Sequence, residues 1–254
     1  MAEQEIVVIK IGTGVLTKED GTLDGASLAR LVGAVADLPS QTRRYVLVSS
    51  GAVGAGTSVL GLSEYPDDLS TRQAAAAVGQ TRLMHAYQNL FNSFDKNVAQ
   101  LLLTADDFSS KERSGRISDT LHRLLAQPGI VPIINENDSV AVEELRVGDN
   151  DLLSARVATL IGARLLVLLT SVDGLMPPGG GEIIEDVPDV AAVLDYAKDV
   201  KGRFSMGGMR GKLEAVQMAV NAGVETVIAN GRHPERLKEI VENGGFATRF
   251  RPRE

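Results

Sequence analysis

An ammonium group stands near the end of the first apolar run of the chain. Residues 6–11 read IVVIKI and residues 12–14 read GTG, so Lys10 lies where a buried strand should end. A buried charge is costly unless something compensates it, and glycine turns after strands can offer backbone N–H groups to an anion. The pair of features predicts an anion site. The alternative is that Lys10 extends from the strand end into water and that the glycines only make a tight turn.

Four further segments rich in glycine, carboxylate or amide groups follow other apolar runs. They are residues 50–56 (SGAVGAG), 135–138 (NEND), 149–151 (DND) and 170–174 (TSVDG). Each has an ordinary structural explanation, such as a turn held by Asn and Asp side chains, or acidic residues favoured at a helix N-terminus. Their common position, directly after strands or before a helix, favours one site built from all of them.

Short apolar runs alternate with helical patterns along the chain. Most of the runs are continuously apolar, which is typical of strands covered on both faces, so the pattern predicts an α/β protein with a mostly parallel sheet. In such sheets ligands bind beyond the carboxyl ends of the strands. The predicted strands are 6–11, 45–49, 98–103, 130–134, 165–169 and 226–229. The predicted helices are 28–38, 69–94, 120–126, 151–161, 209–222 and 234–243.

Local signals support several of these boundaries. Asp24 with Ser27 predicts a cap for the first helix, and Gly223 stands where a C-terminal glycine belongs. Pro and Gly at residues 177–181 break the pattern, and EIIEDV after them predicts a short strand. Residues 198–208 are polar and glycine-rich, and we expect them to form a mobile loop that could act as a lid.

Composition narrows the class of protein. The chain has 254 residues, 44% apolar, with a formal net charge of −7, and we expect one domain over residues 1–254. The acidic balance argues against a nucleic-acid partner, and no apolar run reaches membrane-spanning length. No cysteine is present, and the three histidines lack metal-ligand spacing. We expect a cytoplasmic protein without a membrane partner and without a resident metal.

Known nucleotide motifs are missing. The segment GGMRGK at residues 207–212 is one residue short of a P-loop, and no G-x-G-x-x-G occurs. A P-loop kinase and a Rossmann dehydrogenase are therefore unsupported.

Six motifs in order carry a family resemblance. They are VVIKIGTGVLT, VSSGAVGAG, VPIINENDSV, VGDNDLLSARVA, LLTSVDGL and GGMRGKLEAV. The set resembles the amino acid kinase family over nearly the whole chain, and INEND with VGDND is most similar to its glutamate 5-kinases. The resemblance implies a three-layer αβα sandwich with an open, mostly parallel sheet of about eight strands. It also implies that the N-terminal half binds the amino acid and that residues from about 165 to 254 bind ATP.

The resemblance implies a role for each matching residue. Lys10 and Lys212 would flank the transferring phosphoryl group, and Asp151 would orient both lysines. L-Glutamate would be held by Ser50, Gly51, Ala52, Asp138, Asp149 and Asn150. ATP would be bound by Lys10, Gly12, Thr13, Gly14, Thr170, Ser171, Met206, Gly207, Gly208, Met209, Arg210, Gly211 and Lys212. Mg²⁺ would be carried mainly by ATP rather than by a protein metal site.

The implied reaction, transfer of a phosphoryl group from ATP to the γ-carboxylate of glutamate at the start of proline synthesis, suits these residues. A carboxylate with a pKa of about 4.3 is ionised at neutral pH and needs no general base. The remaining task is to bring two anions together, which requires cations and exact positioning of the reactants. Two alternatives stay open: a related kinase acting on another small carboxylate, carbamate or phosphonate, or a catalytically silent ligand-sensing relative.

The chain departs from the family pattern at several places. Ser171 stands where an aspartate is usual, residues 176–181 replace a tyrosine and an acidic segment, and residues 116–118 replace Asn-Ala-Arg. The small C-terminal domain (PUA) of many relatives is expected to be missing. The alanine run in helix 69–94 could be a packed core or a subunit interface; we favour the interface and predict a homodimer or homotetramer. The resemblance also implies L-proline as a feedback inhibitor.

Overall fold

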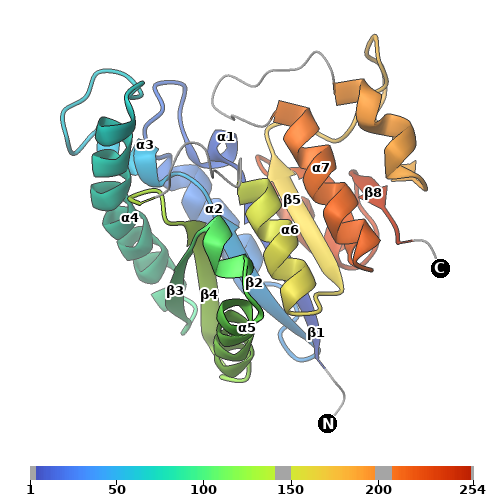
Figure 1. Ribbon diagram of the computed structural model, residues 1–254, viewed down its shortest axis with the longest axis horizontal. Coiled ribbons are helices and arrows are strands. Elements are labelled where there is room, and N and C mark those ends of the chain that lie inside the picture. The colour runs from blue at the N-terminus through green and yellow to red at the C-terminus, as the bar shows by residue number, and fades with distance from the viewer. Residues whose placement is uncertain (1–3, 141–149, 198–207, 253–254) are drawn as a thin grey trace.

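One mixed sheet organises the chain. The computed structural model describes residues 4–140, 150–197 and 208–252 (Figure 1). In this part of the chain eight strands follow the order β3-β4-β2-β1-β5-β7-β8-β6. Neighbours run parallel except β7 and β8, which are antiparallel. The strands are β1 (Glu5–Ile11), β2 (Arg43–Ser49), β3 (Asn97–Leu103), β4 (Ile130–Glu136), β5 (Leu165–Thr170), β6 (Asp186–Val187), β7 (Glu225–Asn230) and β8 (Thr248–Phe250).

Helices cover both faces of the sheet and complete the predicted three-layer sandwich (Figure 1). One face carries α1 (Thr13–Leu16), α2 (Gly25–Ala36), α4 (Leu69–Asn92) and α8 (Leu237–Val241). The other carries α5 (Lys111–Leu125), α6 (Asn150–Leu160), the 3₁₀ helix η3 (Val190–Ala197) and α7 (Gly208–Asn221). The short α3 (Ala52–Thr57), η1 (Ala105–Phe108) and η4 (Pro234–Arg236) complete the described elements.

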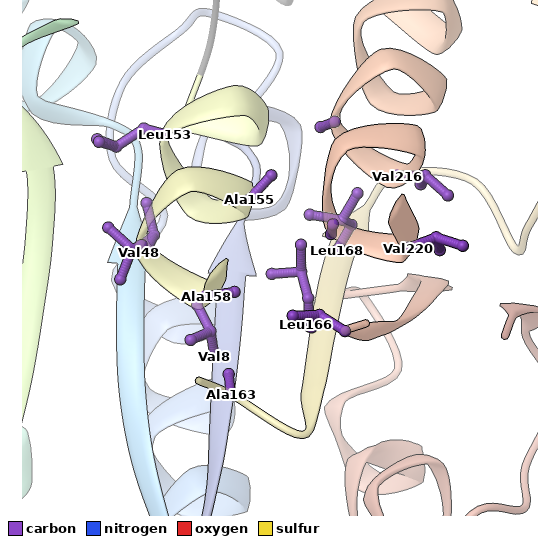
Figure 2. Close-up of a cluster of buried hydrophobic side chains, with 14 of the residues drawn as sticks. Val8, Val48, Leu153, Ala155, Ala158, Ala163, Leu166, Leu168, Val216 and Val220 are labelled. Carbon is purple, nitrogen blue, oxygen red and sulfur yellow. The ribbon is translucent and has the colours of Figure 1, made fainter. Parts of the chain in front are cut away.

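Alternation along β1 divides the hydrophobic core into two layers. Val7 and Ile9 belong to the layer under α2 and α4, whereas Val8 belongs to the layer under α6 and α7. Figure 2 shows the second layer, where Val8 lies beside Ala158 of α6 and Leu166 lies on the side of Val220 of α7. Because both faces are buried, the strands are continuously apolar. The same alternation places Lys10 on the face of Val8, toward α6 and α7.

Most predicted elements are present, with shifted ends. The cap at Asp24 is confirmed, since its side chain accepts hydrogen bonds from the N–H groups of Ala26 and Ser27. The helix predicted at 120–126 begins earlier, at Lys111, because Ser110 caps it by accepting from the Arg113 N–H. Gly223 follows α7 with a φ of 85°, the conformation expected of a C-terminal glycine.

Three short elements differ from the prediction. The strand expected in residues 182–187 is reduced to β6, and the helix expected over 234–243 is divided into η4 and α8. Strand β8 was not predicted, because three residues carry too little periodicity and its place depends on pairing with β7. No helix among the described residues has the length and apolar character needed to cross a membrane.

Candidate active site

A carboxylate bridges two lysines at the carboxyl ends of the central strands. Asp151 lies 2.7 Å from Lys10 Nζ through one oxygen, and Lys212 Nζ donates to its other oxygen at 2.8 Å. The three residues are 2%, 0% and 6% exposed, in the order Lys10, Asp151 and Lys212. The formal charges of these three residues sum to +1. Lys10, Asp151 and Lys212 are named the lysine cluster below.

Each member of the lysine cluster is positioned by its own secondary-structure element. Lys10 is the second-last residue of β1, Asp151 is in the first turn of α6, and Lys212 is in the second turn of α7. A carboxylate in the first turn is favoured by the helix dipole. Helices α6 and α7 lie side by side on the face toward which Lys10 points (Figure 1). The crossover connections of the sheet therefore bring together residues that are distant in sequence.

Two opposing effects act on the carboxyl group of Asp151. Its complete burial raises the pKa, because the charged form is poorly solvated there, but the ammonium groups of Lys10 and Lys212 outweigh burial. The net effect is a pKa well below the usual range of an aspartate. Asp151 is thus a permanent anion at neutral pH, which holds both lysines in place rather than exchanging protons.

The glycines of the first turn let the chain approach Lys10 closely. The Gly12 N–H donates to the Leu169 carbonyl at 2.9 Å. A Cβ atom on Gly12 would lie 3.0 Å from that oxygen and 3.6 Å from Lys10 Nζ. A Cβ atom on Gly14 would lie 3.6 Å from the side chain of Ser171, so the turns after β1 and β5 are adjacent. The turn after β1 therefore lies beside Lys10 at Gly12 and beside Ser171 at Gly14, and ATP binding by Gly12, Thr13 and Gly14 stays a prediction.

Amide groups form a second network on the side of β2 and β4. Asn150, the first residue of α6, donates from Nδ2 to Ser50 Oγ and to Asn135 Oδ1, each at 2.9 Å. Asn135 in turn donates from Nδ2 to Oε1 of Gln80 on α4, at 2.9 Å. These four residues are named the amide network. Ser50 and Asn150 were predicted to bind substrate, and the structure brings them together.

Two members of the amide network were missed by sequence reasoning. Asn135 stood within the quoted NEND segment but received no role, and Gln80 had no signal other than the preceding Gly79. Both are buried, at 2% and 9% exposure. A buried amide needs partners for its donors and acceptors, but only the folded chain shows which partners it finds.

The other predicted substrate residues follow the ends of β2 and β4. Gly51 has a φ of 105°, a conformation that a glycine adopts readily, and it leads into α3 at Ala52. Asp138 lies in the turn after β4 and is half-buried. Asp149, predicted with them, lies outside the described residues.

The predicted nucleotide residues lie across the lysine cluster from the amide network. Thr170 ends β5 and is 8% exposed, and Ser171 follows it. A cleft of about 580 Å³ begins at Ser171 and is bordered by Asp173, Met176 and Phe246. Its volume is in the range of small-molecule pockets.

The first turns of α7 carry the remaining predicted nucleotide residues. Gly208, Met209 and Gly211 lie in the first turn of α7, directly before Lys212 in the second turn. Arg210 is exposed and pairs with Glu214 at 3.1 Å, so its side chain is on the outer surface of α7. Of the lid predicted at residues 198–208, Gly208 is the first residue of α7, and the rest, with Met206 and Gly207, lies outside the described residues.

The small residues of α4 pack within this chain. A Cβ atom on Gly79 would lie 1.8 Å from the Ala52 carbonyl oxygen, and one on Gly56 would lie 1.9 Å from that of Ala75. Helices α3 and α4 therefore cross with backbones in contact, which accounts for the buried part of the alanine run. The subunit interface expected there stays a prediction.

No group of three or more acidic or histidine side chains among the described residues could hold a metal ion.

The amino-acid sequence of the chain is similar to those of known kinases. Residues 5–230 match the family model described as the amino acid kinase family. Glutamate 5-kinase of Caldanaerobacter subterraneus is 41% identical, over 97% of this chain and 68% of its own length. Glutamate 5-kinase of Clostridium acetobutylicum is 42% identical, over 97% of this chain and 94% of its own.

Solved structures agree with the fold. Carbamate kinase from Giardia lamblia, bound to AMP-PNP, matches with a TM-score of 0.65 at 15% identity, over 99% of each chain. UMP kinase from Ureaplasma parvum matches with a TM-score of 0.64 at 15% identity, over 99% of this chain and 97% of its own. At this identity the likeness concerns the fold alone, and it confirms the predicted open sheet between two helical layers.

Proposed function

This chain belongs to the amino acid kinase family, and from that premise we propose that it is an enzyme that phosphorylates the γ-carboxylate of L-glutamate with ATP. The products are L-glutamyl 5-phosphate and ADP. The observation that carries the proposal is the lysine cluster, a buried pair of ammonium groups held 2.7 and 2.8 Å from one carboxylate. An excess positive charge at this position suits a transfer between two anions.

The amide network and the turn after β2 bind glutamate in this proposal. Ser50 and Asn150 supply a hydroxyl and an amide within hydrogen-bond distance of each other. Gly51 and Ala52 supply backbone groups at the start of α3, and Asp138 with Asp149 supply carboxylates for the substrate ammonium group. The acceptor γ-carboxylate would then point toward Lys10.

The opposite side of the lysine cluster binds ATP. Gly12, Thr13 and Gly14 approach the phosphates, Lys212 contacts the transferred group, and the cleft beside Thr170 and Ser171 receives the nucleoside. Residues 206–211 before Lys212 contribute main-chain donors. The chain is thereby divided into an amino-acid-binding half and a nucleotide-binding half, from about residue 165 to 254, joined at Asp151.

The transfer itself requires charge stabilisation more than proton chemistry. An oxygen of the γ-carboxylate forms a bond to the γ-phosphorus of ATP, and the bond from that phosphorus to the bridging oxygen breaks, leaving its electron pair on ADP. Lys10 and Lys212 stabilise the negative charge that spreads over the phosphoryl oxygens, and Asp151 keeps the two ammonium groups aligned. Mg²⁺ enters as part of the MgATP substrate and neutralises part of the phosphate charge.

The biological setting follows from the reaction. The product is an acyl phosphate, the activated form of glutamate with which proline synthesis begins, and we place the reaction in the cytoplasm, where ATP and glutamate are abundant. A homodimer or homotetramer, and inhibition by L-proline, are part of the proposal.

The direct test is ATP-dependent formation of γ-glutamyl hydroxamate in the presence of Mg²⁺ and hydroxylamine. We expect product with L-glutamate but not with L-aspartate or N-acetyl-L-glutamate, and a loss of about 10²–10⁴ in rate for Lys10→Ala. Product with one of the other two acids would indicate a different acceptor. The absence of product with all three would support the silent relative considered above.

A further inference from the structure

We propose that Gln80 of α4 is a positioning residue for glutamate binding, which supplies the acceptor that Asn135 Nδ2 needs in the observed orientation of the amide network, without contacting substrate. The inference rests on the proposed function and adds a residue to it. Gln80 is 9% exposed, and its Oε1 accepts a hydrogen bond from Asn135 Nδ2 at 2.9 Å. Two further hydrogen bonds, from Asn150 to Asn135 and from Asn150 to Ser50, connect it to the predicted substrate residues.

A backbone group determines which way the two asparagine amides face. The Glu136 N–H can only donate, and it donates to Asn135 Oδ1 at 2.9 Å and to Asn150 Oδ1 at 3.3 Å. Both side-chain oxygens must therefore face this N–H. Asn135 Nδ2 is directed away from it, toward α4, where it needs an acceptor because Asn135 is 2% exposed. Gln80 Oε1 provides that acceptor.

The orientation of the Asn150 amide also determines the hydrogen-bonding role of the Ser50 hydroxyl. Asn150 Nδ2 faces Asn135 Oδ1 and also donates to Ser50 Oγ at 2.9 Å. Since Ser50 is the acceptor in this contact, its hydroxyl hydrogen can be directed at a substrate carboxylate. If the Asn150 amide were reversed, its oxygen would face Ser50 and would take the hydroxyl hydrogen for itself. Glutamate binding would lose a donor although every side chain remained in place.

Gln80 reaches Asn135 because α4 lies unusually close to α3. The preceding residue, Gly79, touches the Ala52 carbonyl so closely that a Cβ atom would lie 1.8 Å from it. The small residues of α4 therefore have a function within the chain: they set the depth at which Gln80 meets the end of β4.

The substitution Gln80→Met removes the acceptor and nearly preserves the length of the side chain. We expect it to raise KM for L-glutamate about tenfold, the effect of one lost hydrogen bond, with kcat and KM for ATP within about twofold of wild type. The separate substitution Gln80→Glu keeps an acceptor oxygen, so its KM for glutamate should stay within about twofold of the wild-type value. The matched control is Gln88→Met on the same helix, where Oε1 accepts from the Val98 N–H at 3.1 Å, away from the site; it should leave both KM values unchanged.

Steady-state kinetics and thermal unfolding of the four proteins decide the question. An unchanged KM for glutamate in Gln80→Met, or an equal rise in the KM for ATP, would overturn the positioning role and leave Gln80 as a purely structural residue. A KM for glutamate in Gln80→Glu that is raised as much as in Gln80→Met would overturn the positioning role as well. A wild-type protein without glutamate-dependent ATP turnover would instead overturn the proposed function, and this inference with it.

Discussion

A cluster of ion pairs lies at the carboxyl ends of the central strands, and another lies at the amino ends. The two clusters differ in burial and in the type of cation. At the carboxyl ends, the lysine cluster places two ammonium groups on one carboxylate. At the amino ends, arginines alternate with glutamates across the strands. This amino-end cluster consists, among the described residues, of Glu5, Arg43, Arg164, Glu225 and Arg249, with ion-pair distances of 2.6–3.6 Å.

The arginines of the amino-end cluster also donate to the main chain. Arg164 donates from Nη2 to the Val241 carbonyl at 3.0 Å, and Arg249 donates from Nη2 to the Ile240 carbonyl at 3.0 Å. A planar guanidinium can satisfy several acceptors at fixed angles, which makes it suited to holding strands and loops together. The amino-end cluster is also partly hydrated, since Glu5 is 43% exposed. It stabilises the fold and offers little to a ligand.

The lysine cluster uses compact ammonium groups in a nearly dry site. A lysine ammonium is a point charge on a flexible stem, so it can follow an oxygen that moves during a reaction. Burial makes the excess positive charge strong, because a low dielectric weakens screening. The comparison teaches that a similar formal charge can serve architecture or chemistry, and that burial and donor geometry decide between them.

The largest expected effect is a loss of kcat when a cation is removed from the lysine cluster, compared with removal of a cation from the amino-end cluster. Lys212→Met should lower kcat by about 10²–10⁴, because the developing charge on the phosphoryl group loses a partner. Its free energy of unfolding should stay the same or rise, since the remaining Lys10–Asp151 pair is neutral. Arg43→Met at the amino end should leave kcat within about twofold. Comparable losses of kcat in both variants would contradict the division between the two ends.

The next effect concerns the anion of the lysine cluster and its pH dependence. Asp151→Asn should lower the free energy of unfolding by about 3–5 kcal/mol at neutral pH, because two buried ammonium groups lose their counter-ion. The pKa of Asp151 is lowered by folding, so its stabilising contribution is complete above a pH of about 4 and is lost as the pH falls below that value. Wild type and variant should therefore converge on acidification.

Urea unfolding of Asp151→Asn and wild type, measured from neutral pH down to about pH 2.5, checks this expectation. A difference that stays constant over this range would show that the carboxylate of Asp151 is not held by the lysines in the manner described.

The smallest effect is expected at the exposed part of the amino-end cluster. Glu5→Gln breaks contacts of 2.9 and 3.1 Å with Arg43 and Arg164, but water can replace much of the interaction. We expect a loss of less than about 1 kcal/mol in the free energy of unfolding, reduced further at high salt, and no change in kcat. Chemical denaturation at low and high sodium chloride concentrations measures it, and a salt-independent loss would contradict the exposed, structural character of the cluster.

Sequence reasoning succeeded where local chemistry carries the signal. The glycine turn after β1, the charge of Lys10 within an apolar run and the acidic start of α6 are all readable without a structure. It was weaker for short elements such as β6 and β8, whose residues form strands because neighbours pair with them. Gln80 was missed for a related reason, since an isolated glutamine on a helix has no periodicity and no motif.

The residues at the strand ends, and thus the chemical groups available, were determined by the sequence alone. Apolar runs that end in lysine, glycine, serine or asparagine specify strands with polar ends, because burial and backbone sterics act on each segment separately. The tertiary structure decided which of these groups meet. Residue alternation in β1 and the crossover connections place α6 and α7 on the face of Lys10, so that a single carboxylate of Asp151 reaches both lysines.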